Sequence, residues 1–357
     1  MELNADDRGL RALRGPKNAL DPRVPYGFFV ERERGPDGAL VDVATVLLTN
    51  RECPFTCLMC DLWVNTTDAT VPAGAIAAQL DHALARLAPA RAIKLYNAGS
   101  FFDAKAIPPG DWDAILERVR PFEQVIVEAH PALIGASALE LARRLEGRLE
   151  VAMGLETAHP GVLARLNKRM TLDDFRSAAE RLGAAGVPVR AFVLLRPPYL
   201  AEADGVHWAL ESVRFARACG VSVTVLIATR GGNGALERLA AQGDFAPPVL
   251  ASLETALEQG VAEAARPDPA ARVRSPQSMR VFADMWDAAR LEGCAACRDA
   301  RLARLRVMND EQVVPAPVVC SACGAGSRDT GSHDAGSRDA GSDDRGSRDV
   351  GGAPRAS

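Results

Sequence analysis

The sequence predicts an α/β protein built on a sheet of parallel strands. From Val43 to Thr229, short β-branched apolar runs alternate with amphipathic stretches of helical period, as consecutive βα units do. The 357 residues, 48% of them hydrophobic, suffice for one large core with smaller additions. A loop with three closely spaced cysteines follows the first predicted strand. Because reactive groups collect at the carboxyl ends of parallel strands, we expect the functional site there.

Six strands are expected, all parallel, with helices between them. The predicted strands span residues 43–48, 92–96, 124–127, 149–154, 189–195 and 221–227. Helical spacing places one apolar face near residues 76–87 and another near residues 112–119. A further helix is expected to begin at Thr171, capped with Asp174. The same period fits an open partial barrel, a closed eight-stranded barrel or a doubly wound sheet.

The cysteine loop is the most informative motif of the chain. Cys53, Cys57 and Cys60 form a C-x3-C-x2-C pattern, a spacing that lets three thiolates hold one face of a [4Fe–4S] cluster. A fourth cysteine is absent from this loop, which would leave one iron open to a small molecule. A zinc knuckle and three unrelated core thiols are the alternatives, but structural zinc usually takes four nitrogen or sulfur ligands, and this triplet lacks the fourth.

This motif resembles the signature of radical S-adenosylmethionine (SAM) enzymes. The resemblance implies a partial (β/α)6 TIM-like barrel, with the cluster held by Cys53, Cys57 and Cys60 and with SAM as cosubstrate on the open iron. It further implies cleavage of SAM to a 5′-deoxyadenosyl radical that abstracts hydrogen from a substrate. An electron donor such as flavodoxin or ferredoxin would be the partner.

Several further strings narrow the resemblance. The chain is similar, over about residues 25 to 290, to the radical SAM component of archaeosine synthase and more distantly to the radical SAM domain of the Elongator catalytic subunit. The strings are GSFFD at 99–103, GLET at 154–157, LNK at 166–168 and RPPYLAE at 196–202. Archaeosine synthase acts on a modified deazaguanine in transfer RNA, so the resemblance implies modification of a nucleoside or tRNA base.

Cosubstrate-binding residues are expected at the ends of the predicted strands. By the resemblance, Gly99 and Ser100 lie against the methionyl part of SAM, and Glu156 reaches its ribose or amine. Asn97, in the same glycine-bearing turn, is a further candidate for cofactor binding. Met59 stands where many radical SAM loops carry an aromatic residue, and a thioether can pack against adenine there.

Glu128 and Arg196 are the candidate catalytic residues. A carboxylate facing a barrel mouth is costly to bury without a partner, so Glu128 is a candidate for binding or proton handling. Arg196 can clamp a carboxylate, with two prolines stiffening its loop. His130 replaces an arginine that the subgroup often has, and we expect it to act mainly as a hydrogen-bonding group.

A second cysteine set lies near the end of the chain. Two C-x2-C knuckles, Cys294 with Cys297 and Cys320 with Cys323, are 22 residues apart. This spacing predicts a zinc site, with an auxiliary iron–sulfur cluster as the alternative. Cys219 stands alone and is expected to be a buried core thiol.

Charge and targeting signals limit the partners and the compartment. A net charge of −4 argues against a broad nucleic-acid footprint, although Arg165, Lys168 and Arg169 form a short basic run that reads mainly as a solvated face. A free small metabolite is therefore the alternative substrate. Residues 1–8 lack the apolar core of a signal peptide and no run of 18 apolar residues follows, so a cytoplasmic protein without membrane contact is expected.

Four regions are expected along the chain. They are an N-terminal extension (1–40), the barrel (41–290), a four-cysteine metal segment (291–324) and a disordered tail of GSxD repeats (325–357). A non-catalytic iron–sulfur redox or sensor protein remains the alternative from another functional class. A zinc-stapled binding module would explain only the second cysteine set.

Overall fold

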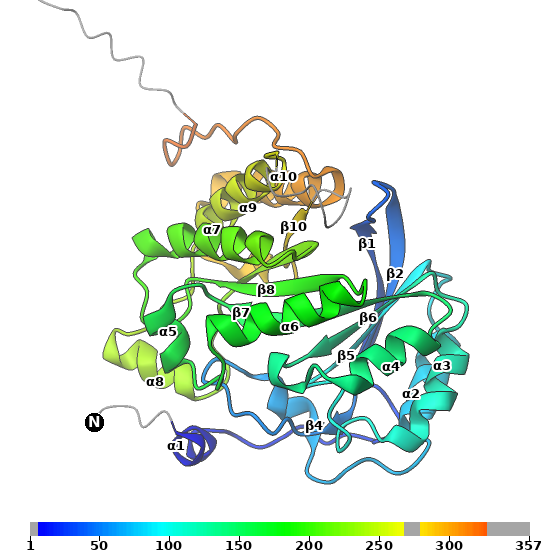
Figure 1. The fold of residues 1–357 in the computed structure, drawn as a ribbon. Coiled ribbons are helices and arrows are strands. Elements are labelled where there is room, and N and C mark those ends of the chain that lie inside the picture. The colour runs from blue at the N-terminus through cyan, green and yellow to red at the C-terminus, as the bar shows by residue number, and fades with distance from the viewer. Residues whose placement is uncertain (1–5, 268–278, 327–357) are drawn as a thin grey trace, which may run out of the picture.

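A curled, open sheet forms the centre of the computed structural model, which describes residues 6–267 and 279–326 (Figure 1). Eight strands lie in the order β1-β2-β5-β6-β7-β8-β9-β10. Neighbouring strands run parallel except β1 and β2, which are antiparallel. The bounds are β1 Gly27–Arg34, β2 Leu40–Leu48, β5 Ala92–Asn97, β6 Gln124–Ala129, β7 Arg148–Glu156, β8 Val189–Leu195, β9 Val223–Ala228 and β10 Arg280–Ala283.

Helices connect the strands and pack mainly on the outer face of the sheet (Figure 1). The helices are α1 Asp7–Ala12, α2 Ala75–Leu84, α3 Trp112–Val119, α4 Ala136–Arg144, α5 Pro160–Arg165, α6 Leu172–Ala184, α7 Glu202–Ala218, α8 Ala235–Gln242, α9 Leu250–Ala264 and α10 Arg298–Glu311. A short pair, β3 (Asn50–Arg51) and β4 (Thr66–Thr67), flanks the cysteine loop. None of the described helices combines the length and apolar character needed to cross a membrane.

The predicted open parallel barrel is confirmed, with two additions. All six expected strands are present, with ends that differ by a few residues. The structure adds β10, a seventh parallel strand, and β1, which lies in the predicted N-terminal extension and pairs along the whole of its length with β2. The predicted cap of α6 is also confirmed, since Thr171 and Asp174 form a reciprocal capping box. From residue 327 on, the predicted tail lies outside the described residues.

Buried apolar side chains fill the space between the sheet and its helices, and Cys219 is among them, as predicted. The inner face of the sheet is different, because ion pairs fill the barrel near the amino ends of the parallel strands. Arg190 Nε lies 2.6 Å from Glu150 Oε1, and its Nη1 lies 3.0 Å from Glu33 Oε2. Lys94 Nζ lies 2.7 Å from the same Glu33 oxygen. We call Glu33, Lys94, Glu150 and Arg190 the basal ion network.

Candidate active site

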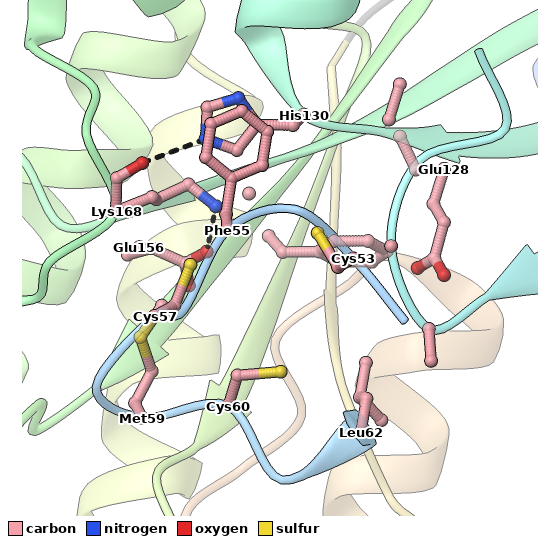
Figure 2. A pocket seen from close by; sticks show the side chains of 16 residues that line it. Cys53, Phe55, Cys57, Met59, Cys60, Leu62, Glu128, His130, Glu156 and Lys168 are labelled. Carbon is pink, nitrogen blue, oxygen red and sulfur yellow. Dashed lines mark hydrogen bonds and ion pairs between the residues drawn. The ribbon is translucent and has the colours of Figure 1, made fainter. Parts of the chain in front are cut away.

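The three cysteines of the 53–60 loop line a cavity at the carboxyl ends of the parallel strands (Figure 2). The cavity has a volume of about 150 Å³. The rest of its wall comes from residues at or near the carboxyl ends of β5, β6 and β7, from Phe192 of β8, from Leu62 and from the segment before α6. We call the site the cysteine pocket and define it by Cys53, Cys57, Cys60, Glu128, Glu156 and Lys168. The loop and the strand ends are thus brought together as the sequence predicted.

The chemistry of the three thiols suits a metal cluster. Burial raises the pKa of the Cys57 thiol to about 11 and those of Cys53 and Cys60 to about 12. Backbone N–H groups of Phe55 and Leu62 donate to the Cys53 and Cys60 sulfurs and partly oppose this rise. Because burial favours the neutral thiols, a bound metal centre would supply the positive charge needed to hold all three as thiolate ligands.

Polar groups beside the loop also lack partners. Both side-chain polar atoms of Asn97 and the hydroxyl of Ser100 are buried without a hydrogen bond among the described residues. Gly99 lies between them, and a Cβ atom at this position would come within 3.2 Å of Cys53 Cβ. Since buried polar groups are nearly always satisfied in native proteins, the unpaired atoms suit a polar ligand such as the methionyl part of SAM.

Glu156 enters the pocket paired with a lysine. The pairing between β7 and β8 shifts in register between Gly154 and Glu156, and Glu156 has a φ of 65°. This irregularity turns the carboxylate into the pocket, where Oε1 lies 2.7 Å from Lys168 Nζ (Figure 2). Burial alone would lower the pKa of Lys168, but Glu156 and Cys57 raise it, so the ammonium stays charged.

Lys168 lines the pocket, where sequence reasoning did not place it. The expected solvated basic face is wrong for this residue, because the side chain is buried and points toward the cysteine loop. Its neighbours Asn167 and Arg169 both have positive φ angles, so the chain turns sharply around it. The Asn-Lys pair after the GLET string was the available signal, but its burial depends on Glu156, twelve residues earlier.

Glu128 lines the pocket without a cationic partner in the described residues. Burial raises the pKa of its carboxyl to about 8, although backbone N–H groups of Asn97 and Gly99 donate to it and lower the value. The carboxyl can therefore hold a proton near neutral pH. This property suits the predicted role of Glu128 in binding or proton handling, which stays a prediction.

His130 is a satisfied hydrogen-bonding group. Its Nδ1 accepts from the backbone N–H of Ala132 at 3.1 Å, so Nε2 carries the proton and donates to the carbonyl of Lys168 at 3.0 Å. Burial lowers the pKa of the ring to about 4, and the ring stacks on Phe55 with centroids 3.7 Å apart. The neutral imidazole thus supports the wall of the pocket.

The structure brings Met59 into the pocket wall but leaves Arg196 outside it. Arg196 Nη1 lies 2.6 Å from Glu202 Oε2 and 2.8 Å from the carbonyl oxygen of Pro247. The guanidinium is therefore used to anchor the start of α7. Its catalytic role stays a prediction that this geometry does not support.

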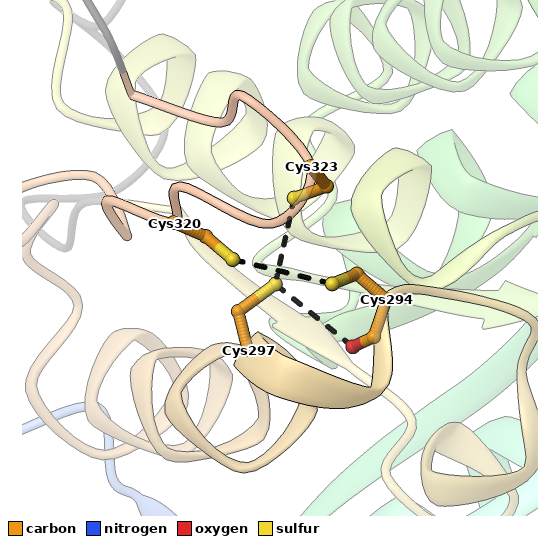
Figure 3. A group of neighbouring side chains, drawn as sticks. All are labelled: Cys294, Cys297, Cys320 and Cys323. Carbon is orange, nitrogen blue, oxygen red and sulfur yellow. Dashed lines mark hydrogen bonds between the residues drawn. The ribbon is translucent and has the colours of Figure 1, made fainter.

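The second cysteine set converges as predicted, and the four sulfur atoms lie within 4.8 Å of one another (Figure 3). Cys294 Sγ and Cys320 Sγ are 4.0 Å apart, and Cys297 Sγ and Cys323 Sγ are 3.9 Å apart. Arg301 Nε donates to Cys297 Sγ at 3.3 Å. This group can hold a metal ion.

Comparison with known proteins supports the predicted resemblance. The chain is 33% identical over 165 residues to archaeosine synthase subunit beta of Thermococcus kodakarensis, a match that covers 44% of this chain and 51% of the relative. The chain is similar to archaeosine synthase subunit beta. It is also 26% identical over 244 residues to the Methanosarcina acetivorans protein of that name, covering 65% of this chain and 70% of the relative. It thus spans about half the length of the Thermococcus relative.

No protein-family model matches the chain. Among solved structures, coproporphyrinogen III oxidase from Escherichia coli, described as a radical SAM enzyme, aligns with a TM-score of 0.40 and 13% identity. This alignment covers 72% of the chain and 55% of the oxidase. A likeness this weak carries no argument about the activity of this chain.

Proposed function

We propose that the protein is a radical SAM enzyme whose cluster is held by Cys53, Cys57 and Cys60. The observation that carries the proposal is the cysteine pocket itself. Three half-buried thiols of a C-x3-C-x2-C loop face one cavity, beside buried polar side chains that lack hydrogen-bond partners among the described residues. When bound, a [4Fe–4S] cluster and SAM supply a 5′-deoxyadenosyl radical.

The residues around the loop bind and orient the cosubstrate. Asn97, Gly99 and Ser100 receive its methionyl group, because their polar atoms lack other partners and the glycine permits close approach. Glu156, held by Lys168, accepts hydrogen bonds from its hydroxyl or amine groups. Glu128 holds or accepts a proton beside the substrate. A small electron carrier such as flavodoxin or ferredoxin is the proposed partner.

The proposed substrate is a nucleoside or a tRNA base. The support is the similarity to proteins named archaeosine synthase subunit beta. A free small metabolite is the second candidate, favoured by the net charge of −4. A non-catalytic iron–sulfur sensor is less well supported, because the loop offers three cysteine ligands and leaves a cavity beside them.

Production of 5′-deoxyadenosine tests the proposal without knowledge of the substrate. The anaerobically reconstituted protein is given SAM and a strong reductant, and product is measured by chromatography. We expect product from the wild type and from Cys219→Ala, whose thiol is buried in the core away from the pocket. We expect none above background from Cys57→Ala. Retained cleavage in Cys57→Ala would refute the assignment.

We propose zinc for the second cysteine set. Four thiolates on a tetrahedral zinc at about 2.3 Å lie about 3.8 Å apart. The sulfur–sulfur separations of 4.0 and 3.9 Å suit this ion better than a four-iron cube, in which each thiolate binds a different iron. Elemental analysis checks this: we expect one zinc in the wild type, lost in Cys297→Ser, and iron for one cluster. An iron content sufficient for two clusters, with no zinc, would contradict the zinc assignment.

A further inference from the structure

Aromatic side chains line the interior of the barrel next to the cysteine pocket. Strand register turns Tyr96 of β5 and Phe192 of β8 to the inner face, and Phe192 also lines the pocket. Although β6 and β7 separate their strands, the two rings meet edge to face with centroids 5.9 Å apart. The pair lies on the inner face above the basal ion network. It therefore forms a floor beneath the pocket.

One side of this interior lies where the two edges of the sheet approach each other. Phe29 of β1 shares the inner face with Glu31 and Glu33, since alternate residues of a strand point the same way. Its ring lies 5.5 Å from the ring of Trp286, which follows β10. Because β1 and β10 are the two edges of the described sheet, this ring contact bridges the gap between the edges, which we call the seam.

Trp286 is exposed although its ring contacts Phe29 across this seam. Its relative exposure of 67% is high for a large hydrophobic side chain. Two ion pairs tie the seam to the cysteine loop: Arg230 Nη1 lies 2.7 Å from Asp287, which follows Trp286, and Nη2 lies 3.1 Å from Asp61, which follows Cys60. An exposed indole is thus held next to Asp287, which Arg230 links to the residue that follows Cys60.

We propose that Trp286, backed by Phe29, is the platform on which a planar heteroaromatic group of the substrate stacks. The inference rests on the proposed function, because it names how the substrate of the same site is held. Stacking needs only an exposed π face, which every base and heterocycle provides. The floor of Tyr96 and Phe192 limits how deeply such a group descends, so the group would stay near the pocket.

Titration of the reconstituted protein with guanosine, followed by calorimetry, tests the platform. We expect Trp286→Ala to bind guanosine about tenfold or more weakly than the wild type, with Trp286→Phe between them. Trp208→Phe is the matched control, because this tryptophan packs on His159 at α7, away from the seam. Ribose, which lacks a planar ring, should not bind. Guanosine affinity of Trp286→Ala within twofold of the wild type, or equal binding of ribose, would overturn the inference.

Two additional measurements extend this experiment. One distinguishes a base on RNA from a free nucleoside, and the other distinguishes failure of the platform from failure of the proposed radical chemistry. A single-stranded oligoribonucleotide that binds more tightly than guanosine and loses affinity with salt would identify a base presented on RNA. Equal affinity without salt dependence would identify a free nucleoside, and either result supports the platform. Formation of 5′-deoxyadenosine by the wild type is scored separately. Loss of stacking with retained cleavage overturns only the platform, and the reverse result overturns only the proposed chemistry.

Discussion

Charged and polar groups lie inside the barrel at both ends, but several of those in the cysteine pocket, unlike those of the basal ion network, lack partners among the described residues. In the basal ion network, Arg190 and Lys94 hold the pKa of Glu33 well below its ordinary range against the opposing effect of burial. In the cysteine pocket, burial raises the pKa values of Glu128 and of all three thiols. Neighbouring polar atoms of Asn97 also lack partners among the described residues.

The difference separates groups that stabilise the fold from groups that await a ligand. A network whose charges neutralise each other is complete within the chain, and its removal should affect folding. Groups left unpaired at a cost in stability are typical of functional sites, where a ligand supplies the missing interactions. Variants at the two ends should therefore differ in stability, in ligand binding and in their response to pH.

The largest effect on stability is expected from Arg190→Met. This change leaves Glu33 and Glu150 as buried carboxylates that have lost their shared partner, which costs about 3 to 5 kcal/mol. Urea denaturation of the metal-free protein measures the free energy of unfolding. Arg143→Ala is the control, since this exposed arginine pairs with Glu140 on the surface of α4 and should change stability by less than about 0.5 kcal/mol. Equal losses would show that the network is not structural.

A smaller effect is expected from Gly154→Ala at the pocket end. The added methyl group would lie 2.6 Å from Lys168 Nζ and would also clash with the Glu156 carboxylate. Displacing this pair should cost about 1 to 3 kcal/mol and weaken SAM binding by the reconstituted protein. Thermal denaturation and equilibrium SAM binding measure the two effects.

Gly183→Ala is the matched control for this variant. Position 183 lies in α6 with open space around it, so alanine should stabilise the helix slightly and leave SAM affinity unchanged. If Gly154→Ala binds SAM as the wild type does, the Glu156–Lys168 pair does not form part of the cosubstrate site.

Local signals explain why most of the sheet was predictable and β1 was not. The six predicted strands, β2 and β5 to β9, are apolar runs. Most of their residues are buried or half-buried in the folded protein. In contrast, β1 carries alternating charges, Glu31 and Glu33, that turn inward. Their inward direction makes sense only with Lys94 and Arg190, which lie on strands far along the chain. β10 has only four residues, too few for a periodic signal.

The candidate site also has one part that was predictable from the sequence and one part that was not. Both cysteine sets were predicted because ligand spacing within one loop or knuckle is visible in the sequence. The burial of Lys168 and the role of Arg196 as a helix anchor were not predicted. Each depends on contact with a carboxylate, that of Glu156 or Glu202, which forms only in the folded chain. Pairing between charges six and twelve residues apart across irregular turns is therefore the part of this site that helix and strand patterns do not predict.

A pH-dependent effect of similar size is expected from Glu128→Gln. The carboxyl of Glu128 has an ordinary pKa of 4.5 and a pKa of about 8 in the folded protein. The folded state thus keeps a proton that the unfolded state releases, and stability falls as pH rises through this window. Glutamine cannot titrate, so between pH 5 and pH 8 the wild type should lose about 1 to 3 kcal/mol relative to Glu128→Gln. Urea denaturation of the metal-free protein at both pH values measures this difference.

Glu33→Gln provides the contrast from the other end of the barrel. Because the pKa of Glu33 is lowered in the folded state, its stabilising effect is complete above its ordinary value of 4.5 and is lost only as pH falls below that value. This variant should therefore be destabilised equally at pH 5 and pH 8, whereas the effect of Glu128→Gln should differ between them. The same pH response in both variants would mean that Glu128 is as well paired as the basal ion network. It would then have no proton to exchange with a substrate near neutral pH.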